Sequence, residues 1–228
     1  MHTMQLYHHP LDPHSRFVRL VLAEKGIEAE KLEEAFWQRR EGFMRLSPAG
    51  TLPVLVDDTG ASLCDAVAIA EYIEETSATP PLLGSAPRDR AEVRRLMRWF
   101  VDKFAYEVAT PTMNERLWKR LAGANGQNST PDTALLRAAS FNTRYHLAYI
   151  NWLMDRRPWL AGEYLSLADL AAAAMLSSLD YFGNVAWDEA PEAKDWYSKI
   201  KCRPSFRSLL ADHIPGLPPA PHYTNLDF

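Results

Sequence analysis

Two stretches near the beginning of the chain, Met4-Gln5-Leu6-Tyr7 and Asp12-Pro13-His14-Ser15, decide how its first part folds. The first is a short apolar run typical of a strand, and the second opens a helical pattern over residues 16–25. A strand, a proline turn and a helix start bring the unpaired N–H groups of the helix N-terminus to one point. Those groups favour negative charge, so the arrangement predicts a site that could hold a thiolate.

The residues at that point do not suit thiol chemistry. In a thioredoxin-type Cys-x-x-Cys site, the helix N-terminus lowers the pKa of the first thiol. The two sulfur positions correspond here to Asp12 and Ser15. A carboxylate cannot exchange thiols and is a poor neighbour for another thiolate. The strand–turn–helix arrangement suggests sulfur chemistry, whereas Asp12 and Ser15 at the two sulfur positions argue against it.

Short elements alternate as far as residue 80. Gly26 should stop the first helix, and Asp57-Asp58-Thr59-Gly60 predicts a hairpin turn. The remaining elements that we expect are a strand within 28–35, a helix at 39–46, strands at 53–56 and 61–63, and a helix at 65–76. The order β-α-β-α-β-β-α predicts a small mixed sheet with helices on its faces.

The second part of the chain carries helical patterns only. Pro80 to Gly84 reads as a linker, and Pro111 should kink or end the long helix that begins near Pro87. Later helices are expected over about 131–157, after the capping-box-like pair Ser166 and Asp169, over about 190–201, and after Pro204. The fold class is α/β followed by all-α, with domains at 1–80 and 81–215 and an extended, Pro-rich tail at 216–228. We expect four tryptophans in the core of the helical domain: Trp152, Trp159, Trp187 and Trp196.

Composition excludes several classes of protein. The 228 residues have a net charge of −4, which does not suggest a nucleic-acid binder. No stretch of about 18 apolar residues could span a membrane, and the first residues lack the pattern of a signal peptide. The two cysteines, Cys64 and Cys202, form no disulfide or metal pattern, and we interpret them as buried thiols of a cytoplasmic protein.

Three histidines near the start, His8, His9 and His14, could suggest a metal site. Neighbouring residues on a strand point to opposite faces, so His8 and His9 cannot easily share an ion. No cysteine or carboxylate pair completes a ligand set, so we expect no metal.

Four stretches together resemble the cytosolic glutathione transferase family from end to end. They are Leu6-Tyr7 through Leu22-Ala23-Glu24-Lys25-Gly26, Ser47-Pro48-Ala49-Gly50-Thr51-Leu52-Pro53-Val54-Leu55, Leu63-Cys64-Asp65-Ala66-Val67-Ala68-Ile69, and Leu160-Ala161-Gly162-Glu163-x-Leu165-Ser166-Leu167-Ala168-Asp169. The resemblance implies a thioredoxin-like N-terminal domain, a helical C-terminal domain and a homodimer. It also implies a cis peptide bond before Pro53, which would leave the backbone groups of Leu52 free to pair with glutathione.

The chain departs from the family at its binding residues. The usual catalytic Ser or Cys position is Asp12, and Asp65-Ala66 stands where the family has an acid or amide followed by Ser. Asp65 could still bind the amine of glutathione, and the helix starting at Ala66 could receive a carboxylate. The lost Ser hydroxyl removes a charge-assisted hydrogen bond worth about 1.5–3 kcal/mol. We therefore expect no bound cofactor and a poor or absent transferase activity.

Two residues could replace the missing catalytic group. Tyr7 could stabilise a thiolate through its hydroxyl, and Ser15 could activate one. For both we favour a structural role, with the Ser15 hydroxyl bonded to backbone near the helix start. A glutathione-dependent transferase or peroxidase remains the alternative function.

The remaining features indicate protein binding. Trp37, Arg39 and Arg40 are typical of an interface anchor, although Trp37 could equally pack on its own domain. The closing His222-Tyr223-x-x-Leu226-Asp227-Phe228 resembles that of a narrower subgroup, the FtsZ-localised protein A group of alphaproteobacteria. That resemblance implies a non-catalytic cell-division protein that binds FtsZ polymers at the division site and alters their curvature. Its expected partner residues are Trp37, Arg39, Arg40, Tyr223, Leu226 and Asp227. If ordered, the tail would instead pack over the helical domain.

Overall fold

The computed structural model describes residues 3–77, 79–123 and 130–226. Within these ranges the first part of the chain forms a four-stranded sheet in the order β2-β1-β3-β4. Strand β2 runs parallel to β1, and the other neighbours are antiparallel. The strands are β1 (Gln5–His8), β2 (Glu30–Glu33), β3 (Val54–Val56) and β4 (Ser62–Cys64). The four expected strands and their order along the chain are thus confirmed.

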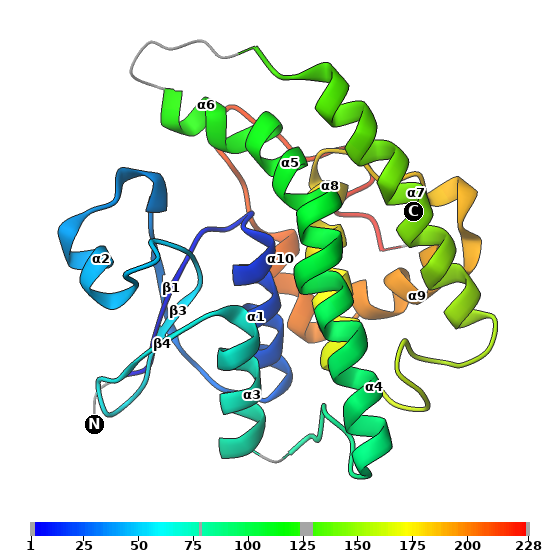
Figure 1. Ribbon diagram of the computed structural model, residues 1–228, viewed down its shortest axis with the longest axis horizontal. Helices are drawn as coiled ribbons and strands as arrows, with labels where there is room; N and C mark the ends of the chain where they lie inside the picture. The colour runs from blue at the N-terminus through cyan, green and yellow to red at the C-terminus, as the bar shows by residue number, and fades with distance from the viewer. Residues whose placement is uncertain (1–2, 78, 124–129, 227–228) are drawn as a thin grey trace.

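Helices flank this sheet on both sides (Figure 1). The short helices η1 (Phe36–Gln38) and α2 (Glu41–Leu46) lie on its outer side, at the left of the view. Helices α1 (Pro13–Glu24) and α3 (Ala66–Thr76) lie between the sheet and the helical part of the molecule. Helix α1 packs against both α3 and the central helix of the second part, so it joins the two halves.

The regular elements in the described residues of the second part are helices, joined by loops that contain two isolated β-bridges. A long run starts at α4 (Pro87–Arg98) and continues through η2 (Trp99–Ala109), α5 (Thr110–Met113), η3 (Asn114–Trp118) and α6 (Lys119–Ala122). The helices that follow are α7 (Thr133–Met154), α8 (Leu167–Tyr181), η5 (Trp187–Glu189), α9 (Pro191–Lys201), η6 (Pro204–Phe206) and α10 (Arg207–Leu210). The fold is therefore that of a thioredoxin-like domain with a helical C-terminal domain, and we keep the exact boundaries at 80 and 215 as a proposal.

Pro111 bends the long helical run without ending it. The segments η2 and η3 on either side of α5 have π-helical hydrogen bonding. A proline inside a helix lacks an N–H donor and crowds the preceding turn, and a wider π turn accommodates this change. Figure 1 shows the run changing direction near α5 and continuing to α6.

Helix α8 is the centre of the core, since every residue from Leu167 to Tyr181 is buried. Its first turn carries the expected pair: the Ser166 N–H and hydroxyl both donate to Asp169 Oδ2, at 3.0 and 2.8 Å. The other oxygen, Oδ1, accepts from the Leu160 N–H and from Trp196 Nε1. Asp169 thus ties the preceding loop and α9 to the start of the central helix.

A buried cation connects α1 to the end of the chain. The Arg16 side chain is fully buried and donates to Tyr223 Oη at 2.9 Å and to Asp212 Oδ2 at 3.1 Å. Arg19, one turn later, donates to both oxygens of Asp212, at 2.8 and 3.0 Å. The two arginines therefore share one carboxylate, and neutral oxygens of the backbone, Ser177 and Tyr223 accept their other hydrogen bonds.

The described part of the tail, residues 216–226, packs against the helical part, as we expected for an ordered tail. The Ala220 N–H donates to the Tyr181 carbonyl at 2.8 Å, and His222 Nε2 lies 2.9 Å from Asp180 Oδ1. Residues 221–224 form turns, so the expectation of a uniformly extended tail is wrong for the described part.

Replacing Asp212 with Asn should destabilise the fold strongly. The change leaves Arg16 and Arg19 buried without their carboxylate, and breaking a buried ion pair costs about 3–5 kcal/mol. We expect urea denaturation to show this loss in the free energy of unfolding. The matched control is Asp102→Asn, which breaks the exposed Arg98–Asp102 pair and should cost less than about 1 kcal/mol. Equal stabilities for the two variants would contradict the assigned role of Asp212.

Candidate functional site

Asp12 is a structural cap of α1. Its backbone is extended, and its Oδ2 accepts a hydrogen bond from the Ser15 N–H at 2.7 Å. An N-terminal cap of this kind satisfies one of the unpaired donors of the helix. Burial raises the pKa of Asp12, while the nearby His14 and the bonds from Ser15 act in the opposite direction. The position that the family uses for a catalytic side chain is therefore occupied by a carboxylate that the helix itself uses.

The two substitute catalytic residues, Ser15 and Tyr7, differ in their surroundings. Ser15 is fully buried, and its hydroxyl makes no hydrogen bond of ordinary geometry to a described residue, although it lies beside the Asp12 carboxylate. The expected bond from that hydroxyl to the backbone is thus absent from the described part, and the Ser15 N–H makes the contact instead. Tyr7 lies on β1, half-buried, with its ring 6.3 Å from that of Phe43.

The backbone element of a glutathione site is retained. The Leu52–Pro53 peptide bond is cis, as the resemblance to the transferases implies. Across the described residues, neither the N–H nor the carbonyl of Leu52 has a hydrogen-bond partner. Leu52 is half-buried and Pro53 is buried at the start of β3. An extended backbone could therefore pair with Leu52 here.

The start of α3 is less suited to glutathione. Asp65, with a left-handed φ of 77°, places its Oδ1 2.9 Å from the Val67 N–H and 3.0 Å from the Ala68 N–H. These are two of the donors at the start of α3 that a ligand carboxylate could use, and the capping side chain already occupies them. Ala66 is buried and offers no hydroxyl. The side chains at Asp12, Asp65 and Ala66 thus do not fit glutathione, although the backbone at Leu52 does.

An aromatic cluster joins the two halves of the molecule beside α1. Its members are His9, Phe36, Trp37 and Trp118, which we call the aromatic cluster. The ring of Trp118, from η3, lies 4.7 Å from His9 and 5.8 Å from Trp37. Trp37 therefore packs on its own domain and on the helical domain as well. Trp118 had no sequence signal that linked it to Trp37, because the contact depends on how the two domains meet.

Burial keeps the histidine of this cluster neutral. It lowers the pKa of His9 to about 4, and the neighbouring His8 and Arg16 add to the effect. His9 Nδ1 accepts a hydrogen bond from the Leu11 N–H at 3.2 Å. At neutral pH the cluster thus presents an uncharged face.

The two arginines after Trp37 differ in their contacts. Arg40 is exposed and forms an ion pair with Glu34, whose side chain is buried. Arg39 is exposed, has a left-handed φ of 47°, and forms no ion pair within the described residues. We call Trp37, Arg39 and Arg40 the Trp37 face; it combines a half-buried indole with one paired and one unpaired guanidinium.

Two of the three tail residues that the sequence suggested, Tyr223 and Leu226, lie in the described part of the chain, and the tail does not join this face there. Tyr223 is fully buried on Arg16, so the expectation that it meets a partner is corrected: it anchors the tail. Leu226 is 42% exposed, and Asp227 lies outside the described residues. Figure 1 shows the tail running toward α7 and α9, away from α2. Within one chain the tail and the Trp37 face are therefore separate surfaces.

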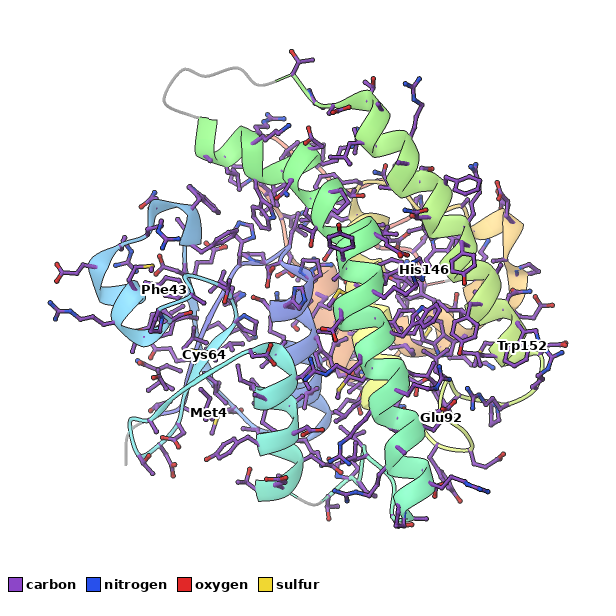
Figure 2. All side chains as sticks on the ribbon, viewed as in Figure 1. Met4, Phe43, Cys64, Glu92, His146 and Trp152 are labelled. Atoms are coloured by element: carbon purple, nitrogen blue, oxygen red, sulfur yellow. The ribbon has the colours of Figure 1, made fainter. Side chains whose placement is uncertain are left out.

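Helix α7 presents exposed aromatic side chains that the sequence did not indicate. Phe141, Tyr145 and Trp152 are all more than half exposed. In Figure 2, Trp152 lies on the outer side of α7, whereas His146 points inward to the π-helical run. There His146 accepts from Trp99 Nε1 and contacts Glu107. Trp152 was expected in the core, which is wrong.

The described residues contain no helix long and apolar enough to cross a bilayer, and no group of three potential metal ligands. Cys64 is half-buried and Cys202 exposed, so the expectation of two buried thiols is wrong.

Asp12→Asn should raise the stability of the protein at neutral pH. The amide oxygen can still cap α1, since Asn and Asp are similarly good caps. The pKa of Asp12 is raised in the fold, so its ionised form is disfavoured there and stability falls as pH rises above the unfolded-state value. The gain of the variant over wild type should therefore shrink on acidification toward pH 4. Thermal unfolding at several pH values measures this difference, and a gain that grows on acidification would show that the fold favours the carboxylate.

Comparisons with known proteins agree with this geometry. Two sequence families match: the glutathione S-transferase N-terminal domain over residues 13–76 and the glutathione S-transferase C-terminal domain over residues 123–204. FtsZ-localized protein A from Caulobacter vibrioides is 48% identical over 226 residues, which are 98% of this chain and 97% of that protein.

Solved structures show the same similarity. The structure of FzlA from C. crescentus has a TM-score of 0.94 at 47% identity and covers 100% of both chains. A glutathione S-transferase from Sinorhizobium meliloti 1021 has a TM-score of 0.95 at 47% identity, again with full coverage. The chain therefore belongs to the glutathione S-transferase family, and within it resembles the FtsZ-localized protein A group.

Proposed function

We propose that this protein is a non-catalytic cell-division protein that binds FtsZ polymers through its Trp37 face and changes their curvature. The observation that carries the proposal is which side chains occupy the positions of the family's glutathione site. Asp12 and Asp65 use their carboxylates to cap α1 and α3, and Ala66 lacks the binding hydroxyl. The end-to-end similarity to a protein named for its localisation with FtsZ supports the same assignment. On this proposal the protein works in the cytoplasm at the division site.

The Trp37 face has the chemistry of a protein-binding surface. Aromatic and arginine side chains are enriched among residues that dominate binding energy at interfaces. Trp37 is held from behind by His9 and Trp118, so little conformational entropy would be lost on binding. The unpaired charge on Arg39 suits an acidic segment of the partner.

A homodimer would explain how binding changes curvature. The exposed aromatic side chains of α7 form an apolar face of the kind that two copies bury between them. Two Trp37 faces held at a fixed angle could engage two subunits of one polymer. Linking the two contacts increases the overall affinity and would impose the angle of the dimer on the filament.

Charge reversal at Arg39 should weaken FtsZ binding. We expect Arg39→Glu to reduce the affinity for polymerised FtsZ by about tenfold, a change of about 1.4 kcal/mol, measured by co-sedimentation at low and physiological salt. The matched control is Arg88→Glu, an exposed reversal in the first turn of α4. If both variants bind like wild type, or if wild type does not co-sediment at all, the proposed surface or the proposed function is wrong.

One observation favours the alternative, a glutathione-dependent transferase or peroxidase using Tyr7 or Ser15. The cis Pro53 and the unpaired backbone groups of Leu52 could still hold the cysteinyl part of glutathione. The side chains around Asp12 oppose it, since a thiolate there would face a carboxylate.

Glutathione affinity separates the two functions. Wild type should bind glutathione too weakly for retention on a glutathione resin. Ala66→Ser should tighten binding by up to about ten- to a hundredfold, because it restores one charge-assisted hydrogen bond. Ala68→Ser, an exposed position in the same turn, is the control. Calorimetry measures all three, and micromolar binding by wild type together with turnover of an electrophilic substrate would favour the enzyme.

A further inference from the structure

Tyr223 makes two polar contacts deep inside the molecule. Its hydroxyl accepts from Arg16 Nη1 at 2.9 Å and donates to the Leu209 carbonyl at 2.8 Å. Its ring lies 5.2 Å from that of Tyr181. The tail therefore contacts the buried guanidinium of Arg16, a residue of α1.

The same guanidinium holds the turn that precedes α1. Arg16 Nε donates to the Pro10 carbonyl at 2.7 Å, a short charge-assisted bond. The next residue, Leu11, is fully buried in a cluster that also contains Tyr223, Tyr181, Met113 and Leu117. The tail is thus linked to this turn in two ways, through Arg16 and through the apolar cluster that contains both Leu11 and Tyr223.

The other end of the turn supports the aromatic cluster. His9 lies next to Pro10, and its ring packs against Trp118 and Trp37. Bonds inside the turn fix its shape: the Leu11 N–H donates to His9 Nδ1, and the Asp12 N–H donates to the His9 carbonyl at 3.0 Å. A shift of Pro10 would therefore move the histidine ring on which Trp37 rests.

We propose that Tyr223 is a positioning residue for the Trp37 face, acting through Arg16 and the His9–Asp12 turn. The proposal rests on the proposed function, because it assigns the tail a part in the same binding event. Without the hydroxyl, Arg16 Nη1 loses one of its two acceptors and keeps Ser177 Oγ. A buried guanidinium with an unmet donor turns toward other acceptors, which loosens its hold on Pro10.

Tyr223→Phe tests this inference, because it removes only the hydroxyl and keeps the ring. The matched control is Tyr181→Phe, which removes a buried hydroxyl from the same cluster; that hydroxyl donates to the Leu217 carbonyl, accepts from the Ile214 N–H and makes no hydrogen bond to Arg16. Two readouts are compared at equal folded fraction: amide hydrogen exchange at Leu11 and Asp12, and affinity for polymerised FtsZ. We expect Tyr223→Phe to exchange faster and to bind at least about fivefold more weakly, while Tyr181→Phe stays close to wild type.

The outcomes separate this inference from the proposed function. If Arg39→Glu weakens FtsZ binding but Tyr223→Phe neither weakens it nor speeds exchange at Leu11 and Asp12, the positioning role is wrong. Equal effects of the two tyrosine variants would also overturn it, since that result indicates general loosening of the cluster. If no variant affects FtsZ binding, the proposed function fails, and faster exchange in Tyr223→Phe alone would still support the positioning of the turn.

Discussion

The buried Arg16 guanidinium is the contact on which the arrangement of this molecule depends. It binds the Pro10 carbonyl before α1, the Ser177 hydroxyl on α8, Asp212 after α10 and Tyr223 in the tail. These groups span the whole chain, so one side chain sets the position of the sheet domain against the helical domain and the tail. A buried cation is tolerated only when its donors are satisfied, and this requirement gives the assembly a defined geometry.

The region beside α1 keeps the cis-proline backbone of a glutathione site, while two of its acidic side chains cap helices. The cis Pro53 still leaves Leu52 unpaired, as a glutathione site requires. Asp12 and Asp65 use their carboxylates to cap helices, which satisfies donors that an anionic ligand would otherwise bind. The rings of Trp37, from the sheet domain, and Trp118, from the helical domain, lie 5.8 Å apart and so connect the two domains.

The sequence predicted what depends on local pattern and missed what depends on distant contacts. The positions of the strands along the chain and the Ser166–Asp169 cap follow from periodicity and capping chemistry, which act within a few residues. The burial of Tyr223 could not be read from its neighbours, because its partner Arg16 is 207 positions away. Trp152 was expected in the core, yet α7 presents it to solvent. The hydroxyl of Ser15 was expected at the backbone, whereas its N–H is the group that the cap binds.

The central claim is that the region around α1 recognises a protein surface in place of glutathione. Hydrogen exchange of the full chain, alone, with polymerised FtsZ and with millimolar glutathione, tests it directly. The account predicts slower exchange over residues 36–40 with FtsZ polymers, and no change over residues 51–53 and 65–68 with glutathione. Protection at the latter two segments by glutathione, without protection of residues 36–40 by FtsZ, would contradict it.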